Sequence, residues 1–382
     1  MQKLIYFDHA ATSYPKPAKV IEQMNKAMTE RGGNPGRSSH LLSVLAAKGI
    51  YECREQVCKL LSFNSPENVI FTQNTTYALN MAIKGLVRNN TSVVISNMEH
   101  NSVIRPLYAM TKMQNSNIRY YMFDASSDDD DDIVYNFIHA LRPDTRTAVV
   151  TMASNVCGRI LPVEKIAGIC NRRKIKLILD GAQTGGIVPI DFGNLGADVL
   201  CLAGHKGLYG PCGTGIMVCK KGTEPKSIIQ GGNGINSLEP TMGTVLPERL
   251  EAGTVNTPGI CGLCEGIKYV MNEGIEEIFE QSLYLARYLT VGLREIPGIN
   301  IYGDYDIKTP VVLFNKKGFS CEEVSEILSR EGICTRSGLH CAPTAHMAIG
   351  SGKSGGVRVS LGHKNTEKEI NFFLKTVNSI NK

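Results

Sequence analysis

Short runs of consecutive apolar residues alternate with longer segments of helical periodicity between about residue 68 and residue 218. Apolar runs without polar alternation are typical of strands buried on both faces of a sheet. We predict such strands at 68–72, 92–96, 119–123, 147–152, 176–179 and 199–203. Helices are predicted between them, for example from residue 75 and at 160–173. This alternation predicts an α/β domain with a mostly parallel sheet and helices on both faces.

The pattern changes after Met217. Residues 231–253 are rich in glycine and proline and predict a long loop, which often marks an interface or a lid. The remaining elements suggest an α+β lobe: helices at 259–271, 276–294, 320–331 and 366–380, and strands at 311–314 and 356–361. We therefore predict a large domain at 15–250 and a small C-terminal domain of residues 251–382 joined by the N-terminal segment 1–14.

Four further segments complete the prediction. The N-terminal segment contains a short strand at 3–7, followed by helices at 17–31 and 49–61. The acidic run at 126–132, which includes Asp128–Asp132, is interpreted as a solvated surface loop.

Length and composition are those of an ordinary globular protein. The chain has 382 residues, of which 42% are hydrophobic and 20% are charged, so a two-domain protein with a large core is expected. The net charge of +5 is spread along the chain, whereas nucleic-acid binding needs a basic patch, and we expect no nucleic-acid partner. No apolar stretch reaches the length of a membrane span, and the N-terminus does not resemble a signal peptide. These features favour the cytoplasm.

Twelve cysteines are scattered along the chain. Without a signal peptide, this distribution favours reduced thiols over a disulfide framework. The pair Cys261 and Cys264 has the spacing of a redox or zinc site, but it lacks a second pair and is interpreted as helix packing; no metal site is expected. The stretch 350–354, GSGKS, resembles the end of a nucleotide-binding loop, but Met347 replaces the required first glycine.

Polar residues recur just after the predicted strands of the large domain, namely His100, Asn155, Asp180 and Lys206. In an open parallel sheet, ligands bind beyond the carboxyl ends of the strands. An acid and an amine delivered to this edge suit pyridoxal 5′-phosphate (PLP), whose ring nitrogen pairs with a carboxylate and whose aldehyde reacts with a lysine. A lone loop lysine is usually solvated, but the acid at a neighbouring strand end and the glycines around Lys206 favour a functional role.

Thr75 and Thr76 open a predicted helix, and a helix N-terminus with two hydroxyls suits a phosphate group. The alternative is an ordinary helix cap formed by Asn74 or Thr75, which is the commoner use of such residues.

The segment 335–346, TRSGLHCAPTAH, places Cys341 among Arg336, His340 and His346. Cationic neighbours lower the pKa of a thiol, as a nucleophilic cysteine requires; the alternative is a packed core cysteine. Arg358 lies inside the apolar run GVRVSL. An inward arginine needs an anion, either a ligand carboxylate held in bidentate fashion or an acidic side chain.

Four motifs together resemble PLP-dependent enzymes of the class V aminotransferase superfamily, and within it the cysteine desulfurases: DGAQ at 180–183, GHKGLYGPCGTG at 204–215, EAGTVNT at 251–257 and RSGLHCAP at 336–343. The resemblance covers nearly the whole chain. It is closest to the group with a short cysteine-bearing loop, which includes selenocysteine lyase-like members. It implies the aspartate aminotransferase-like fold of PLP-dependent transferases.

The resemblance implies roles around the cofactor ring. Lys206 would hold PLP covalently and later shuttle protons, and Asp180 would pair with the pyridine nitrogen. Gln183 would reach the phenolic oxygen, His100 would stack on the ring face, and Asn155 would lie beside the ring.

The resemblance also implies a phosphate site made by Thr75, Thr76 and His205, and completed in a homodimer by Thr254 of the partner subunit. The family usually carries a hydroxyl two positions before the residue that corresponds to His205. Here that position is Ala203, which removes one phosphate ligand and bears on cofactor affinity.

For the reaction, the resemblance implies that Arg358, with Asn155 and Arg336, binds the carboxylate of L-cysteine. Cys341 would attack the substrate sulfur, leaving L-alanine and a persulfide for an acceptor protein or a small thiol. Selenocysteine lysis, or another reaction of the same superfamily such as transamination, is the alternative. A non-catalytic scaffold is a third interpretation, against which the retention of Lys206, Asp180 and Cys341 speaks.

Overall fold

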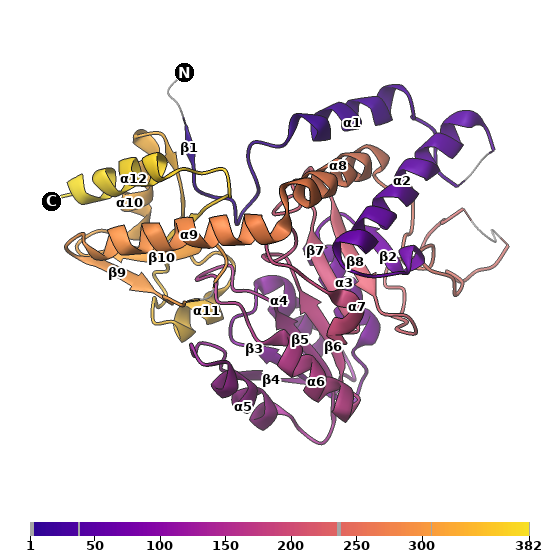
Figure 1. Ribbon diagram of the computed structural model, residues 1–382. Coiled ribbons are helices and arrows are strands. Elements are labelled where there is room, and N and C mark those ends of the chain that lie inside the picture. Colours follow the sequence, from indigo (N-terminus) through magenta and orange to yellow (C-terminus); the bar gives the residue numbers. More distant parts are fainter. Residues whose placement is uncertain (1–3, 37–38, 235–237, 307, 382) are drawn as a thin grey trace.

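The protein consists of a large lobe around a central sheet and a smaller lobe beside it (Figure 1). The computed structural model describes residues 4–36, 39–234, 238–306 and 308–381. The polypeptide begins on the small lobe, builds the large one and returns to the small lobe to end there.

Seven strands form the central sheet, in the order β2 (Val69–Thr72), β8 (Gly215–Cys219), β7 (Val199–Ala203), β6 (Lys176–Asp180), β5 (Thr145–Thr151), β3 (Ser92–Ser96) and β4 (Arg119–Phe123). The pairs from β7 through β4 are parallel, and β8 runs antiparallel to both of its neighbours. The predicted α/β class with a mostly parallel sheet is confirmed.

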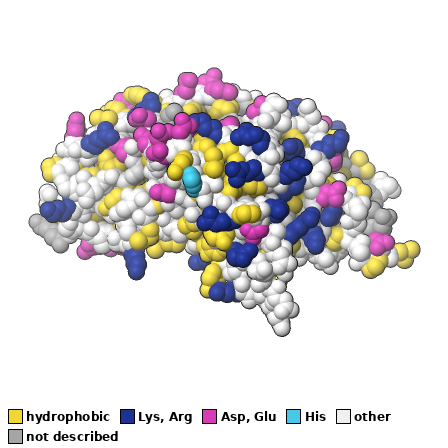
Figure 2. All heavy atoms as spheres, turned by 90° about the horizontal axis from the view of Figure 1, so that it is seen from below, with side chains coloured by type: hydrophobic (Ala, Val, Ile, Leu, Met, Phe, Trp, Pro, Cys, Tyr) yellow, Lys and Arg dark blue, Asp and Glu magenta, His cyan; other side chains and the backbone are white. Residues whose placement is uncertain are grey.

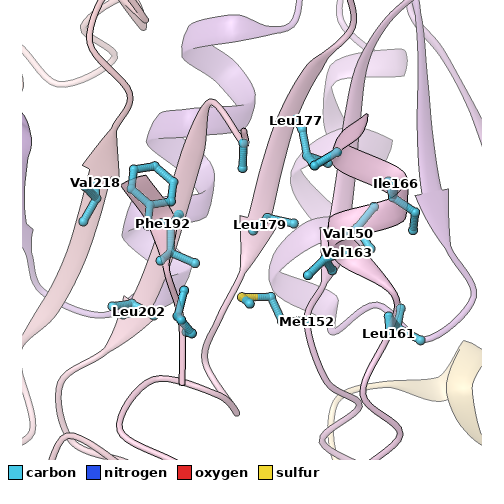
Figure 3. Packing of buried hydrophobic residues seen from close by; sticks show 14 of the residues in the cluster. Val150, Met152, Leu161, Val163, Ile166, Leu177, Leu179, Phe192, Leu202 and Val218 are labelled. Atoms are coloured by element: carbon cyan, nitrogen blue, oxygen red, sulfur yellow. The ribbon is translucent and has the colours of Figure 1, made fainter. Parts of the chain in front are cut away.

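Apolar side chains cover both faces of this sheet, as continuous apolar strands require. One face packs on α3 (Thr75–Leu86) and α4 (Asn101–Thr111), and the other on α5 (Asp130–Ala140) and α6 (Val163–Arg173). Figure 3 shows the second face, where side chains of β5 and β6 lie against residues in and beside α6. The short helix α7 (Phe192–Leu195) contributes Phe192 to the same cluster.

The small lobe contains a four-stranded antiparallel sheet in the order β12 (Arg336–Gly338), β13 (Gly356–Ser360), β10 (Val311–Lys316) and β9 (Ile299–Tyr302). The helices around it are α9 (Ile275–Arg294), α10 (Cys321–Arg330), α11 (Pro343–Ala348) and α12 (Glu367–Ser379). Apolar residues of α9, α10 and α12 pack with β10 and β13 into a separate core. An α+β lobe was predicted for this region, and the structure has one.

The N-terminal segment packs on the small lobe. Strand β1 (Ile5–Tyr6) pairs with β11 (Ile333–Cys334), and Phe7 belongs to the small core. By contrast, α8 (Thr257–Glu273) packs on α1 (Ala18–Thr29) and α2 (Leu41–Leu60) of the large lobe. We therefore propose that the domains divide near Gly274, later than the predicted boundary at residue 250.

Most predicted elements lie within a few residues of those observed, and two differ more. Helix α2 begins at Leu41 rather than at residue 49, because the ring of His40 caps it by accepting the Ser43 N–H at 3.3 Å. The acidic run was predicted to be a loop, and this is wrong for its second half. Asp129 caps α5, whose first turn is acidic, and negative charge is favourable at a helix N-terminus.

The pair Cys261 and Cys264 was predicted to pack in a helix, and residues 350–354 were predicted to precede a strand. Cys261 and Cys264 are buried within α8, where they pack in the core. Residues 350–354 form a turn after α11 that leads into strand β13, whereas a nucleotide-binding loop would lead into a helix. The predicted loop at 231–253 has neither helix nor strand in its described part. Lys3, the first residue of the predicted N-terminal strand, lies outside the described residues.

Figure 2 shows the face at the bottom of Figure 1, where Lys and Arg side chains are spread from the middle to the right and acidic side chains gather at the upper left. Within the described ranges, no helix combines the length and apolar character needed to cross a membrane.

Candidate active site

A cavity of about 220 Å³ lies at the edge of the central sheet where the parallel strands end, and the small lobe closes it. It collects nearly all of the predicted site residues: Thr75, Thr76, His100, Asn155, Asp180, Gln183, His205, Lys206, Arg336, Cys341 and Arg358. Residues separated by more than 200 positions therefore meet here. Loops after β2, β3, β5, β6 and β7 supply the large-lobe side. The other side is supplied by β12, β13 and the cysteine-bearing loop, residues 339–342 between β12 and α11.

Asp180 and Lys206 are the acid and the amine of this cavity. Asp180 ends β6, is 3% exposed, and accepts a hydrogen bond from the Ala182 N–H at 2.9 Å. Burial raises the pKa of Asp180, and attraction to Lys206 opposes this. Burial lowers the pKa of Lys206 to about 8, with Asp180 opposing. A substantial fraction of Lys206 is therefore neutral near pH 8, as a reactive amine requires.

A tight turn after β7 aims Lys206 at the cavity. A Cβ atom on Gly204 would lie 2.2 Å from the Thr214 hydroxyl oxygen, so only glycine fits there. The backbone N–H of Gly210 donates to the carbonyl of Gly204 at 2.8 Å and closes the loop.

His100 lies directly after the β3 turn and caps α4. Its Nδ1 accepts the backbone N–H of Ser102 at 3.0 Å. Burial and the nearby cation of Lys206 lower the pKa of His100 to about 4, so the ring is neutral at neutral pH. With Nδ1 occupied as an acceptor, the ring proton resides on Nε2. His100 thus presents a neutral ring to the cavity, suited to stacking on an aromatic ligand.

The N-terminus of α3 provides an anion site. Asn74, rather than Thr75, caps the helix by accepting the Tyr77 N–H at 3.0 Å. The Thr75 hydroxyl and Nδ1 of His205 are buried, and neither has a hydrogen-bond partner in the described part of the chain. Buried polar atoms normally have partners, so both are free to bind a ligand such as a phosphate group. The alternative of a cap formed by Thr75 is excluded.

Arg358 is almost fully buried in β13 and holds an acidic side chain. Its Nη2 lies 2.8 Å from a carboxylate oxygen of Asp8, and its Nη1 donates to the carbonyl of Asn155 at 3.0 Å. Its Nε is buried and has no partner among the described residues. Arg358 was predicted to bind either a ligand carboxylate or an acidic side chain. The structure pairs it with the acidic side chain of Asp8, and its Nε remains free for a ligand carboxylate.

Sequence reasoning missed two acids beside the cavity. Asp8 follows β1 within FDHAAT, and its position on the apolar–polar boundary of that segment was the available signal. Glu99 precedes His100 and is fully buried, and its carboxylate accepts the Ser96 hydroxyl at 2.5 Å and the Thr151 N–H at 2.8 Å. Burial raises the pKa of Glu99 to about 8, which makes it mostly neutral at pH 7.

The charges around the cysteine-bearing loop differ from those predicted. Cys341 is exposed at the cavity, whereas His340 and His346 are buried. Burial and repulsion from Arg358 lower the pKa of His340 to about 3 and that of His346 to about 4. Both rings are neutral at pH 7, so the prediction that they supply positive charge beside the thiol is wrong. The cations that line the cavity with Cys341 are Arg336, Arg358 and the charged fraction of Lys206.

Thr254 lies outside this cavity in its own chain. Its hydroxyl accepts a hydrogen bond from Asn34 Nδ2 at 3.3 Å, at the edge of a second cavity of about 470 Å³. Its role in a partner's site stays a prediction.

Residues 5–373 match the family described as Aminotransferase class-V. The chain belongs to the class-V aminotransferase family. It is 32% identical to a probable cysteine desulfurase of Methanothermobacter thermautotrophicus, covering 98% of this chain and 94% of that protein. It is also 32% identical to a probable cysteine desulfurase of Mycolicibacterium paratuberculosis, covering 99% of this chain but only 55% of that longer protein.

A solved structure agrees with this class-V family assignment. The apo cysteine desulfurase of Thermococcus onnurineus NA1 superposes with a TM-score of 0.90 at 30% identity, covering 98% of this chain and 94% of that one. The predicted family and the aspartate aminotransferase-like fold are confirmed.

PLP is the cofactor of the class-V family, and the residues of the cavity fit it. The free Thr75 hydroxyl and His205 Nδ1 at the N-terminus of α3 suit its phosphate. The buried carboxyl of Asp180 suits its ring nitrogen, and the amine of Lys206 suits its aldehyde. Ala203 is buried at 3% exposure and offers no hydroxyl, so phosphate binding would depend more on the orphaned atoms of Thr75 and His205.

The Asp8–Arg358 pair gives a stability prediction. Asp8→Ala should lower the free energy of unfolding by roughly 3 kcal/mol, because it leaves the Arg358 guanidinium buried without its acid. Urea unfolding would measure this. The control is Glu326→Ala, which breaks an exposed helix pair with Arg330 and should cost less than about 1 kcal/mol. Equal losses in both variants would show that Asp8 does not compensate a buried charge.

Proposed function

We propose that this protein is a PLP-dependent cysteine desulfurase that converts L-cysteine to L-alanine and carries the removed sulfur as a persulfide on Cys341. The observation that carries the proposal is the meeting of Lys206, Asp180 and Cys341 around one cavity, together with a buried arginine, Arg358. Relatives and solved structures with this architecture are named cysteine desulfurases.

Substrate binding follows from the charges of the cavity. The carboxylate of cysteine would bind the free Nε edge of Arg358, while Asp8 holds the Nη2 edge and the Asn155 carbonyl accepts from Nη1. Arg336 lies at the same cavity and adds a second positive charge. A guanidinium held on two sides is already oriented, so less side-chain entropy is lost when the substrate binds.

The bound cofactor would supply the electron-accepting ring that makes loss of a Cα proton and cleavage of the Cβ–Sγ bond possible. Lys206 Nζ, neutral in substantial part near pH 8, would take up the Cα proton and later return it. The thiolate of Cys341 would attack the substrate Sγ and form an S–S bond. The Cβ–Sγ electron pair stays on carbon, which takes up a proton to become the methyl group of alanine.

The competing reactions differ in their use of Cys341. Transamination needs Lys206 and Asp180 but no thiol at the cavity, whereas an exposed cysteine at the cavity suits sulfur transfer. Selenocysteine lysis stays a second candidate, because the same carboxylate and amine contacts would bind L-selenocysteine. A non-catalytic scaffold has no need of a lysine with a lowered pKa.

The function is tested by incubating the purified protein with PLP and L-cysteine and measuring alanine and sulfide in the presence of a reducing thiol. Equal amounts of the two products are expected. Formation of pyruvate or of an amino-group transfer product in place of alanine would contradict the proposal. The persulfide is tested by mass spectrometry of the peptide that contains Cys341, which should gain one sulfur atom before the thiol is added.

A homodimer would complete the phosphate site with Thr254 of the partner subunit. The second cavity, beside Thr254, is bordered by exposed apolar side chains, among them Tyr51 at 54% and Val245 at 66% exposure. Exposed apolar side chains gathered around a cavity are typical of an interface. The sulfur acceptor would be a protein or small thiol that reaches Cys341 from outside.

We expect the wild type to sediment as a dimer and Val245→Glu to shift it toward monomer, with at least tenfold weaker PLP binding. The control is Val291→Glu, which places the same charge on the exposed face of α9 in the small lobe and should leave the dimer intact. A Val245→Glu monomer that binds PLP as tightly as the wild type would contradict the shared site.

A further inference from the structure

Three buried polar side chains form a continuous hydrogen-bonded chain behind the cysteine-bearing loop. Ser351 contacts His346 Nδ1 at 2.7 Å, and His346 Nε2 lies 3.1 Å from His340 Nδ1. His340 Nε2 lies 3.2 Å from the carbonyl oxygen of Arg336. The two rings are nearly parallel, at 17°, and their centroids are 5.3 Å apart. The three side chains are 0–5% exposed.

The carbonyl oxygen of Arg336, at the end of this series, determines which atom donates in each of its hydrogen bonds. A carbonyl can only accept, so His340 Nε2 carries a proton and donates to Arg336. His340 is neutral, so its Nδ1 accepts from His346 Nε2–H, and His346 Nδ1 is left as an acceptor for the Ser351 hydroxyl, which also lies 3.2 Å from the His346 carbonyl oxygen. This series of hydrogen bonds ends on the carbonyl oxygen of Arg336 rather than on the Cys341 sulfur. It therefore orients the loop and does not conduct a proton to the thiol.

The loop that this chain supports has an unfavourable backbone. His340 and Cys341 both adopt left-handed conformations, with φ of 50° and 58°. Residues with a Cβ avoid this region because the side chain crowds the backbone, so the surroundings must hold both residues there.

Contacts on the cavity side hold the same two residues. The Asn155 side chain donates to the carbonyl of His340 at 2.8 Å, and the Asn101 N–H donates to the carbonyl of Cys341 at 2.7 Å. The backbone of the reactive cysteine is thus clamped between the strand ends of the large lobe and the histidine–serine chain of the small lobe.

We propose that His346 and Ser351 are positioning residues for sulfur transfer, which hold Cys341 in its left-handed conformation at the cavity through His340. This inference rests on the proposed desulfurase function. Cys341 must approach the substrate sulfur within about 3–3.5 Å in a fixed direction, and a loop released from its clamp would sample other orientations.

The test compares His346→Leu with His346→Gln, because a glutamine amide can donate to His340 Nδ1 and leucine cannot. His346→Leu should lower kcat for sulfide release at least tenfold, with the KM for cysteine and the absorption of bound PLP unchanged. His346→Gln should keep kcat within about threefold of the wild type. Ser351→Ala is a milder change and should lower kcat severalfold. It provides the test if His346→Leu does not fold.

A second readout does not depend on activity. Backbone hydrogen exchange at Asn101, whose N–H donates to Cys341, should become at least tenfold faster in His346→Leu than in the wild type or His346→Gln. If kcat and this exchange rate are both unchanged in His346→Leu and in Ser351→Ala, the proposal is overturned. If the wild type itself releases no sulfide, the desulfurase function fails, and the exchange rates alone decide whether the clamp exists.

Discussion

Replacing Cys341 with alanine should abolish sulfide release from L-cysteine, by roughly 10³-fold or more, while PLP binding and its absorption stay as in the wild type. The reason is that the cofactor contacts and the nucleophile come from different lobes. Lys206, Asp180 and the anion site at Thr75, which would hold the cofactor, lie on the large lobe, and the cysteine-bearing loop belongs to the small lobe. Loss of a nucleophile removes covalent chemistry without removing binding.

The matched control is Cys212→Ala. Cys212 is the other exposed cysteine within the described residues, and it lies outside the cavity lining. It should keep wild-type activity and the full persulfide signal. Methylene-blue detection of sulfide and alanine quantification would measure both variants.

L-Selenocysteine separates the two candidate functions in the Cys341→Ala protein. Selenium is a better leaving group and need not be attacked first, so elimination from selenocysteine should survive at a substantial rate. Wild-type sulfide release from L-cysteine by Cys341→Ala would refute the nucleophile role and favour the lyase alternative.

Much of the large-lobe side of the site could be predicted because ligands bind beyond the carboxyl ends of parallel strands. His100, Asn155, Asp180 and Lys206 each follow an apolar run, and the carboxyl ends of parallel strands share one edge of the sheet. The glycines around Lys206 also predicted the turn that contains it. Local pattern and topology are enough when each residue is placed by the end of its own strand.

The contacts between the lobes could not be predicted in this way. Asp8 and Arg358 are 350 positions apart, and nothing in the local pattern of either segment specifies that they pair. The charge of His340 and His346 likewise depends on burial, which the loop sequence does not reveal. Nearby histidines suggested cations, but desolvation leaves both rings neutral.

Lys206→Ala should lose cysteine desulfuration almost completely, by roughly 10⁴-fold, which is the upper range for removal of a proton-transferring group. The variant also loses the amine that reacts with the aldehyde of PLP. Borohydride treatment of the wild type should fix the cofactor on the peptide containing Lys206, and the variant should give no labelled peptide.

Lys16 provides a demanding control for Lys206. Burial lowers the pKa of Lys16 to about 8 as well, so a substantial fraction of each amine is neutral near pH 8. The Lys16 amine, however, donates to the Ser13 hydroxyl and to the His205 carbonyl, both at 2.7 Å, and is held away from the cavity. Lys16→Gln should retain covalent labelling at Lys206. Labelling of Lys16 in the wild type would show that a lowered pKa, rather than placement, selects the lysine.

The pH dependence of cofactor uptake tests the state of the Lys206 amine. Only the neutral amine attacks an aldehyde, and the Lys206 pKa of about 8 means that the neutral fraction falls about tenfold for each pH unit below 8. The rate of covalent PLP uptake by the cofactor-free protein should therefore rise steeply from pH 6 to pH 8 and level off above it, as followed by absorption. A rate that keeps rising to about pH 10 would indicate an ordinary solvated lysine and contradict the desolvation of Lys206 beside Asp180.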